Sequence, residues 1–165
     1  MQYKHLIVIA LLTAVGFSCE SSTSEKPSED PQEKAALNAI FPQGQKGPAE
    51  LFTGNAYNYG LVPPDSTFTT LVGNVYFEPG ARSNWHSHPA GQILIITDGV
   101  GYHQIEGQAI ETIRKGDVVK CPPGVKHWHG ASPDTGLQQL YIVPNTEQGI
   151  VEWNEAVTEE QYSPK

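Results

Sequence analysis

The sequence predicts an all-β fold, a single sandwich or barrel of about eight short strands. Runs rich in β-branched and aromatic residues recur along residues 69–153. Turn signals such as Asp98-Gly99 and Lys115-Gly116 separate these runs at regular spacing. A chain of 165 residues is long enough for one such domain and a tail.

The expected strands follow one another from residue 69 onward. They are, in chain order, 69–78, 92–97, 100–105, 108–113, 117–121, 127–131, 137–143 and 150–153. Each one is bounded by Gly or Pro, as at Pro79-Gly80 and Pro122-Pro123-Gly124. From residue 47 onward, only residues 154–162 are compatible with an amphipathic helix, so a helical bundle is excluded.

Residues 1–18 have the pattern of a targeting signal. Lys4 and His5 precede an apolar stretch that is too short to span a bilayer as a helix. Gly16-Phe17-Ser18-Cys19 resembles the lipobox of bacterial lipoproteins, in which the Cys becomes the diacylated N-terminus. The resemblance implies a lipid anchor on Cys19 in the cell envelope, at the outer rather than the inner membrane because no Asp follows Cys19. An ordinary secretory signal is the alternative.

Residues 19–46 are expected to tether the anchor to a domain at residues 47–165. The tether is rich in Ser, Glu and Pro up to Pro31, so it cannot bury apolar surface. A helix-compatible stretch follows at residues 32–41.

Charge and cysteine content exclude several classes of protein. Ten Lys and Arg against 18 Asp and Glu give a net charge of -8, which repels a phosphate backbone. Nucleic acid is therefore not an expected partner. The two Cys, Cys19 and Cys121, fit neither a disulfide-stapled miniprotein nor a four-thiolate zinc site.

Four of the six histidines form two pairs with one residue between the members, His86/His88 and His127/His129. Because side chains alternate along a strand, both members of a pair project from the same face. Gln92 follows His88 after a Pro-Ala-Gly bend that can return its amide oxygen to the same place. Unpaired buried imidazole nitrogens cost about 1–3 kcal/mol each, and a shared divalent ion removes that cost. His86, His88, Gln92 and His127 are the predicted metal ligands.

Two motifs resemble the paired motifs of the cupin superfamily. They are Gly80-x5-His86-x-His88-x3-Gln92-x6-Gly99 and Gly116-x5-Pro122-x-Gly124-x2-His127. The resemblance implies the cupin double-stranded β-helix, a jelly-roll barrel, with one bound divalent metal. Two positions depart from the pattern: Gln92 replaces the usual glutamate ligand, and Ala131 replaces an Asn.

The segments around the motifs, such as 77–82 and 159–162, are similar to a narrower group of small cupins with three His ligands and one Gln. That group includes manganese-dependent hydroxynitrile lyases. The resemblance implies a lyase that acts on a small molecule such as mandelonitrile by Lewis acid and proton-transfer chemistry. Manganese is the implied ion, with iron, zinc, nickel, cobalt and copper as alternatives. Small cupins often pair, so a homodimer is expected.

The candidate residues for proton transfer are His129, Ser83 and Gln139. His129 is equally compatible with orienting a ligand or with a structural role. Ser83 is expected to place a hydroxyl at the mouth of the pocket. Gln139 matches a pocket-lining position of the lyase-like group, and so does Gly73, where a small residue leaves room for a compact substrate.

The neutral Gln92 amide leaves a bound ion with its full charge, which favours Lewis acid work over the activation of oxygen. Two other function classes stay open. One is oxidation by dioxygen, as in quercetinase-like cupins, and the other is non-catalytic capture of a sugar or a metal by an envelope protein.

Three nearby residues are expected to have structural roles only. Arg82 is expected to form a surface ion pair with Glu78 or Asp98. Cys121 is expected to pack as a small buried residue, and Trp128 to face away from the metal because it alternates with His127 and His129.

Overall fold

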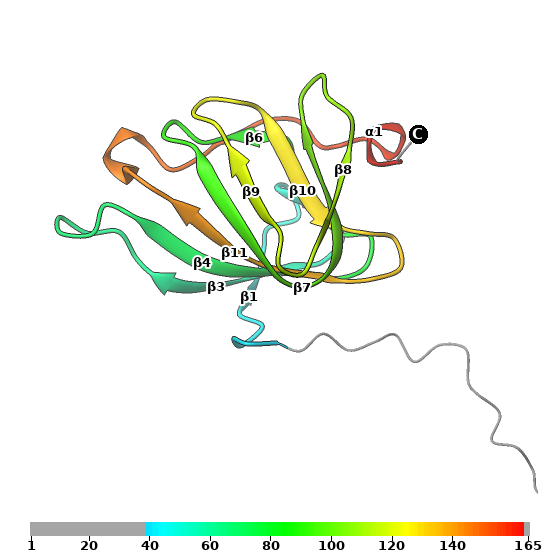
Figure 1. Ribbon diagram of the computed structural model, residues 1–165, viewed down its shortest axis with the longest axis horizontal. Coiled ribbons are helices and arrows are strands. Elements are labelled where there is room, and N and C mark those ends of the chain that lie inside the picture. The colour runs from blue at the N-terminus through cyan, green and yellow to red at the C-terminus, as the bar shows by residue number, and fades with distance from the viewer. Residues whose placement is uncertain (1–38, 164–165) are drawn as a thin grey trace, which may run out of the picture. The chain divides into compact units, whose positions relative to one another are not determined.

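The computed structural model describes residues 39–163 of the chain, and within them strands curl around one interior (Figure 1). The predicted signal and most of the predicted tether lie outside the described residues. The described part contains twelve strands and very little helix, which confirms the predicted all-β class. It contains no helix that is long and apolar enough to cross a membrane.

The strands are short apart from β7. Their bounds are β1 (Gln45–Lys46), β2 (Phe52–Thr53), β3 (Ala56–Val62), β4 (Leu71–Phe77), β5 (Arg82–Ser83), β6 (His86–Ser87), β7 (Gln92–Ile105), β8 (Glu111–Arg114), β9 (Val118–Cys121), β10 (His127–Ala131), β11 (Leu137–Val143) and β12 (Glu152–Trp153). The helical elements are the 3-10 turn η1 (Thr146–Gln148) and helix α1 (Glu159–Tyr162).

Strand β7 belongs to both sheets of the barrel. Its first part pairs with β11 and β9, and its second part pairs with β10 and β8. The first sheet continues from β11 through β4 and β3 to β1, and in the second sheet β10 pairs with β5 and β6. The two sheets therefore face each other across one core, with the histidine strands β6 and β10 in the second sheet.

The turn predicted at Asp98-Gly99 is wrong, because one strand continues through it. Gly99 adopts the left-handed region, with a φ of 85°. A Cβ at this position would lie 2.0 Å from the carbonyl oxygen of Gly136, so a side chain has no room. Gly99 lets a single strand bend from one sheet into the other. In the sequence, the same pattern is equally typical of a hairpin turn.

Two further differences have simple causes. Strand β3 is missing from the expected strands because it contains Asn58 and Gly60, which are poor strand formers. The helix-compatible stretch at 154–162 is helical only in α1, where Thr158 and Gln161 form a capping box.

A second apolar cluster lies outside the barrel and fastens the C-terminal segment to it. It consists of Trp85, Trp128, Val157 and Tyr162. Trp128 has no exposed surface and faces this cluster, away from the histidines, as expected.

Arg82 lies against the same cluster, which corrects the predicted surface ion pair. The Arg82 side chain is buried and lies 4.4 Å from the centre of the Tyr162 ring. Its guanidinium donates to the Val157 carbonyl at 3.1 Å and to Glu159 at 2.7 Å. The Glu159 partner is 77 residues away in sequence, and only the folded chain brings it to Arg82.

Candidate metal centre

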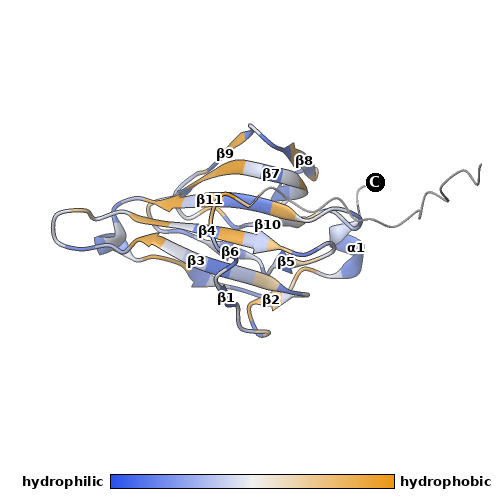
Figure 2. Cartoon of the chain, turned by 90° about the horizontal axis from the view of Figure 1, so that it is seen from below, coloured by the Kyte–Doolittle hydropathy of each residue, from blue (hydrophilic) through white to orange (hydrophobic). Residues whose placement is uncertain are grey.

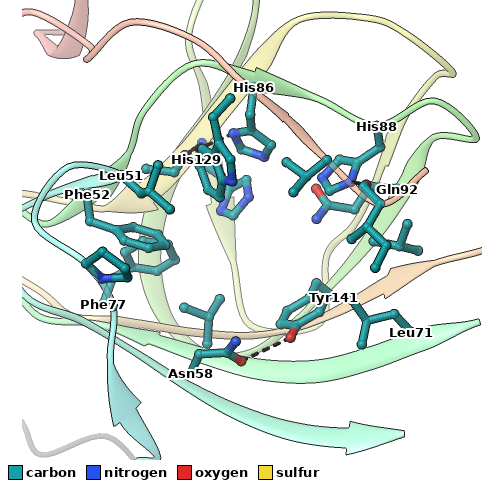
Figure 3. A pocket seen from close by; sticks show the side chains of 18 of the residues that line it. Leu51, Phe52, Asn58, Leu71, Phe77, His86, His88, Gln92, His129 and Tyr141 are labelled. Carbon is teal, nitrogen blue, oxygen red and sulfur yellow. Dashed lines mark hydrogen bonds between the residues drawn. The ribbon is translucent and has the colours of Figure 1, made fainter. Parts of the chain in front are cut away.

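The two histidine pairs meet inside the barrel. His86 on β6 lies opposite His127 on β10, and their ring centroids are 4.4 Å apart. The His88 ring lies 5.2 Å from the His86 ring and 5.7 Å from the His127 ring. Gln92, at the start of β7, places its Oε1 atom 3.2 Å from His127 Nε2. The structure thus brings together the four predicted ligands, all of them buried. Figure 3 shows three of them, His86, His88 and Gln92.

The rings of His86, His88 and His127 are all fixed in the same tautomer. In each ring Nδ1–H donates to a backbone carbonyl, which leaves the lone pair of Nε2 free. The acceptors are the carbonyls of Asn84 (2.9 Å), Ile150 (2.5 Å) and Val125 (2.9 Å), respectively. Such backbone bonds orient histidines that bind metals, because they hold the ring and raise its basicity.

Two of these lone pairs, on His88 and His127, have no proton donor among the described residues. His88 Nε2 is buried without a hydrogen-bond partner. His127 Nε2 and Gln92 Oε1 face each other at 3.2 Å, and in this tautomer and amide orientation both atoms are acceptors. Two acceptors at this distance repel each other unless a cation lies between them. The donor set of three imidazoles and one amide oxygen therefore fits a divalent metal.

Burial keeps these rings neutral. Desolvation lowers the pKa of His86 well below its ordinary value, and the nearby His127 ring lowers it further. Desolvation also lowers the pKa of His88, and it lowers the pKa of His127 to about 4. A neutral imidazole keeps the lone pair that a metal requires, so the site is ready to bind at neutral pH.

His129 differs from the other three in its tautomer. One nitrogen each of His86, His127 and His129 lies within 4.8 Å of the others, and His88 is not in this set, so distance alone would make His129 the third ligand. However, Gln139 Nε2 donates to His129 Nδ1 at 2.8 Å, so Nε2 carries the ring proton. A protonated nitrogen cannot bind a metal. The hydrogen bonds therefore favour His88 over His129 as the third imidazole ligand.

Ser83 is buried beneath the histidines instead of lying at the mouth of the pocket. Its Oγ accepts a hydrogen bond from the backbone N–H of His129 at 3.2 Å and lies 3.5 Å from His86 Nδ1. The side chain is 1% exposed. Ser83 thus connects the two histidine strands at the wall of the pocket.

A pocket of about 500 Å³ opens in front of the histidines. Most of its walls are apolar, and they come from both sheets and from the loop before β12. The apolar lining includes Leu51, Phe52, Leu71, Val75, Phe77, Val143, Ile150, Val151 and Trp153. His86, His88, Gln92 and His129 supply the polar end (Figure 3). Such a pocket suits a small, largely apolar molecule with one polar group.

Comparisons with known proteins agree with this architecture. Residues 73–143 match the family model described as a cupin domain. An (R)-mandelonitrile lyase from Granulicella tundricola is 48% identical over 117 residues, which cover 71% of this chain and 89% of that protein. The chain belongs to the cupin family. This result confirms the predicted double-stranded β-helix and the predicted similarity to the hydroxynitrile lyase-like group.

Solved structures show the same fold. A cupin-like protein from Thermotoga maritima is 49% identical, with a TM-score of 0.73 over 76% of this cupin and 95% of that chain. A cupin-2 domain protein from Rhodospirillum rubrum is 22% identical, with a TM-score of 0.57 over 72% of this cupin and 75% of that chain. The second likeness concerns the fold alone.

A fifth histidine of the cupin lies inside the barrel and was missed from the sequence. His103 on β7 is 2% exposed, and its ring lies 5.8 Å from the His127 ring. The Cys121 thiol lies 3.5 Å from its Nε2. The alternation of β7 could have revealed His103, since it shares a face with the buried Gly101. Burial raises the pKa of Cys121 to about 12, so this thiol does not act as a nucleophile.

Two residues of the first sheet shape the far wall of the pocket. A Cβ on Gly73 would lie 2.3 Å from Tyr141 Oη, so the phenol ring occupies the space that a side chain at position 73 would need. The Tyr141 hydroxyl donates to Asn58 at 3.0 Å. Gly73 is not among the residues that line the pocket, because Tyr141 fills the space that Gly73 leaves.

Proposed function

We propose that this cupin is a metal-dependent lyase that acts on a small apolar or aromatic compound by Lewis acid and proton-transfer chemistry. The concrete reaction is the cleavage or formation of a cyanohydrin such as mandelonitrile. The observation that carries the proposal is the tautomer pattern: three imidazole lone pairs and one amide oxygen converge, while His129 stays outside that set. The similarity to a mandelonitrile lyase supports the same reaction class.

His86, His88, Gln92 and His127 would hold one divalent ion, for which we propose manganese. Iron, zinc, nickel, cobalt and copper also bind nitrogen-rich sets of this kind. All four ligands are neutral, so the ion would keep its full charge. When bound, such an ion supplies Lewis acidity that stabilises negative charge on a substrate oxygen.

His129 is the proposed carrier of the transferred proton. In cyanohydrin cleavage the hydroxyl loses a proton, the carbon–carbon bond to the nitrile breaks, and its electron pair leaves with cyanide, which takes up a proton. A carbonyl compound and hydrogen cyanide result. Nε2 of His129 can take the proton from the hydroxyl once the Gln139 amide has turned and the ring proton lies on Nδ1, and the same Nε2 then gives a proton to cyanide.

Gln139 is proposed to determine which nitrogen of His129 carries the ring proton. With its amide nitrogen on His129 Nδ1, the proton sits on Nε2, which is then a donor. In this orientation Gln139 Oε1 is buried and has no hydrogen-bond partner within residues 39–163. If the amide turned, Oε1 would accept from Nδ1–H and Nε2 would become a base. Ser83 holds the His129 backbone in place and acts as a positioning residue.

The apolar walls are proposed to hold the body of the substrate and to exclude water. Phe77 packs edge-on against the His129 ring, with centroids 5.6 Å apart. An aryl group lying along Phe77 and Val75 would bring its polar carbon next to His129. A dry site also strengthens the interaction of a bound cation with the oxygen of the substrate.

The experiment is to follow mandelonitrile and dissolved oxygen together, with the manganese-loaded and the metal-stripped full chain. Metal-dependent formation of benzaldehyde and cyanide without oxygen uptake supports the lyase. Oxygen consumption that scales with iron content would instead indicate a dioxygenase. Saturable ligand binding without turnover would indicate a binding protein. His129→Asn should abolish turnover but keep the metal, which separates proton transfer from metal binding.

We propose in addition that Cys19 carries a lipid that anchors the protein in the bacterial cell envelope, at the outer membrane. The support is the lipobox-like sequence before Cys19 and the polar segment after it. Labelling with radioactive palmitate in a bacterial host tests this. Label that persists in Cys19→Ala would refute the anchor.

A further inference from the structure

The pocket has a second polar end, opposite the histidines. Asn58 on β3 and Tyr141 on β11 interrupt its otherwise apolar lining. Figure 3 shows both side chains across the pocket from His86 and His129, with the amide nitrogen of Asn58 turned toward the pocket. Neither Asn58 nor Tyr141 has a part in the proposed metal binding or proton transfer. Polar groups in an apolar pocket orient the molecule that it binds, so this end is expected to contact a ligand.

The position of the Tyr141 hydroxyl is fixed by the neighbouring strands. Strands β3, β4 and β11 lie side by side in the first sheet (Figure 2). The Tyr141 ring lies over Gly73 of β4, where a Cβ would be 2.3 Å from Tyr141 Oη. The hydroxyl donates to Asn58 Oδ1 at 3.0 Å, so the phenol reaches from β11 across β4 to β3. Burial raises the pKa of Tyr141, so the hydroxyl keeps the proton that it donates.

This hydrogen bond leaves one donor and one acceptor for a ligand. Oδ1 of Asn58 is the acceptor in the bond, so the amide nitrogen of Asn58 can still donate. Tyr141 Oη uses its proton in the same bond, so its lone pairs can still accept. A hydroxyl group is complementary to this pair because it both donates and accepts. A carboxylate only accepts, and it would face the lone pairs of Tyr141.

The strand register relates this pair to His129. Asn58, Val75 and Gln139 are neighbours in one row across β3, β4 and β11. Gln139 donates to His129, and Val75 lines the pocket between the two ends of the row. Neighbouring strands are about 4.8 Å apart, so Asn58 and Gln139 are separated by about 10 Å. A flat ring lying over Val75 would therefore direct one end toward His129 and the opposite end toward Asn58.

We propose that Asn58 and Tyr141 bind a hydroxyl group of the substrate, on the ring position opposite the carbon that reacts. The inference rests on the proposed function and narrows its substrate class to para-hydroxylated aryl compounds. Asn58 Nδ2 donates to the oxygen of this hydroxyl, and Tyr141 Oη accepts its proton in a hydrogen bond. Asn58 and Tyr141 are thus specificity-determining residues, and His129 lies at the reacting end.

A carboxylate at the same ring position is the alternative ligand group. Lys46 on β1 also lines the pocket, and no acidic residue is found in the described lining. However, Lys46 is exposed, so water and salt screen its charge. The groups that the fold holds in place at this end are the Asn58 amide and the Tyr141 hydroxyl, and these match a hydroxyl.

The test is calorimetric titration of the manganese-loaded full chain with benzyl alcohol and with 4-hydroxybenzyl alcohol. Both compounds keep the hydroxyl-bearing carbon of a cyanohydrin but lack the nitrile, so they bind without reacting. We expect the wild type to bind 4-hydroxybenzyl alcohol about 10-fold more tightly, as two hydrogen bonds of ordinary net strength would give. The preference is moderate because Asn58 and Tyr141 bond to each other when no ligand hydroxyl is present.

Two variants remove the two groups separately. Tyr141→Phe keeps the ring over Gly73 and removes the oxygen, whereas Asn58→Leu removes the amide. Each should lower the preference to about 3-fold or less, since one hydrogen bond is lost, and should leave the affinity for benzyl alcohol unchanged. Tyr59→Phe is the matched control, because Tyr59 is an exposed tyrosine of β3 that does not line the pocket. It should keep the preference of the wild type.

Equal binding of the two alcohols by the wild type overturns the proposal, and so does a failure to bind either one. A full preference in folded Asn58→Leu and Tyr141→Phe also overturns it. If circular dichroism shows that Tyr141→Phe is unfolded, Asn58→Leu decides, since it changes an exposed strand position. Tighter binding of 4-(hydroxymethyl)benzoate than of both alcohols, lost in Lys46→Met, would overturn it in favour of a carboxylate.

The binding assay separates this inference from the proposed function. Cleavage of mandelonitrile by a wild type that binds both alcohols equally would reject the hydroxyl contact and leave the lyase. A preference for 4-hydroxybenzyl alcohol in a protein without turnover would support the contact and reject the lyase.

Discussion

Paired substitutions of His88 and His129 test the assignment of the ligands. The rings of both histidines lie near those of His86 and His127, but their ring protons are placed differently. If Nδ1–H bonding to a backbone carbonyl marks a ligand, His88→Ala should lose the metal and His129→Ala should keep it. His127→Ala, which removes another ligand, should behave like His88→Ala.

The expected size of the effect follows from ligand loss. Removing one of four ligands should weaken binding by about 100-fold or more, since even partners that only orient the ligands contribute about 10–100-fold. At a fixed excess of metal, a 100-fold change in affinity removes about 2.7 kcal/mol of stabilisation. For a domain of this size that lowers the melting temperature by about 10 °C.

The assay is the metal-dependent increase in melting temperature, with elemental analysis of the dialysed protein. Each variant is compared with its own metal-stripped form, so the cavity that each substitution leaves cancels. His88→Ala should show about 10 °C less stabilisation by manganese than His129→Ala. If His129→Ala loses the metal while His88→Ala binds it normally, the tautomer argument is wrong.

Three further predictions concern pH, ligand charge and packing. Burial lowers the pKa of His127 to about 4 in the folded protein, whereas the unfolded chain binds this proton below about pH 6.5. The metal-free protein should therefore lose about 3 kcal/mol of unfolding free energy between pH 6.5 and 4. Urea titrations that give a flat profile over this range would contradict it. Gln92→Glu should tighten manganese binding about 10-fold in chelator competition and reduce turnover, because the added charge weakens the Lewis acid. Faster turnover would refute the proposal that the neutral amide favours Lewis acid chemistry. Gly73→Ala should cost about 1–3 kcal/mol in urea unfolding, because its Cβ would lie 2.4 Å from Tyr141 Cζ, and Gly73→Ala/Tyr141→Ala should recover much of that loss.

Patterns between near neighbours made much of the barrel predictable from the sequence. The strands at β4, β9, β10 and β11 and the inward direction of His86 and His127 follow from a two-residue period and from Gly and Pro turns. Gly99 shows the limit of this reasoning, since its left-handed conformation serves a bend within β7 as well as it would serve a hairpin. The difference depends on the backbone of Gly136, which is distant in sequence.

The sequence alone predicted a β barrel and four candidate ligands. The prediction rested on the types and spacing of residues and on the resemblance of two motifs to the cupin superfamily. The state of those ligands could not be read in this way, because the proton on each imidazole is placed by a partner from elsewhere in the chain: Ile150 for His88, and Gln139 for His129. The burial of Arg82 against Tyr162 likewise arises from long-range packing. Such contacts join segments that are far apart in sequence, so local sequence patterns do not predict them.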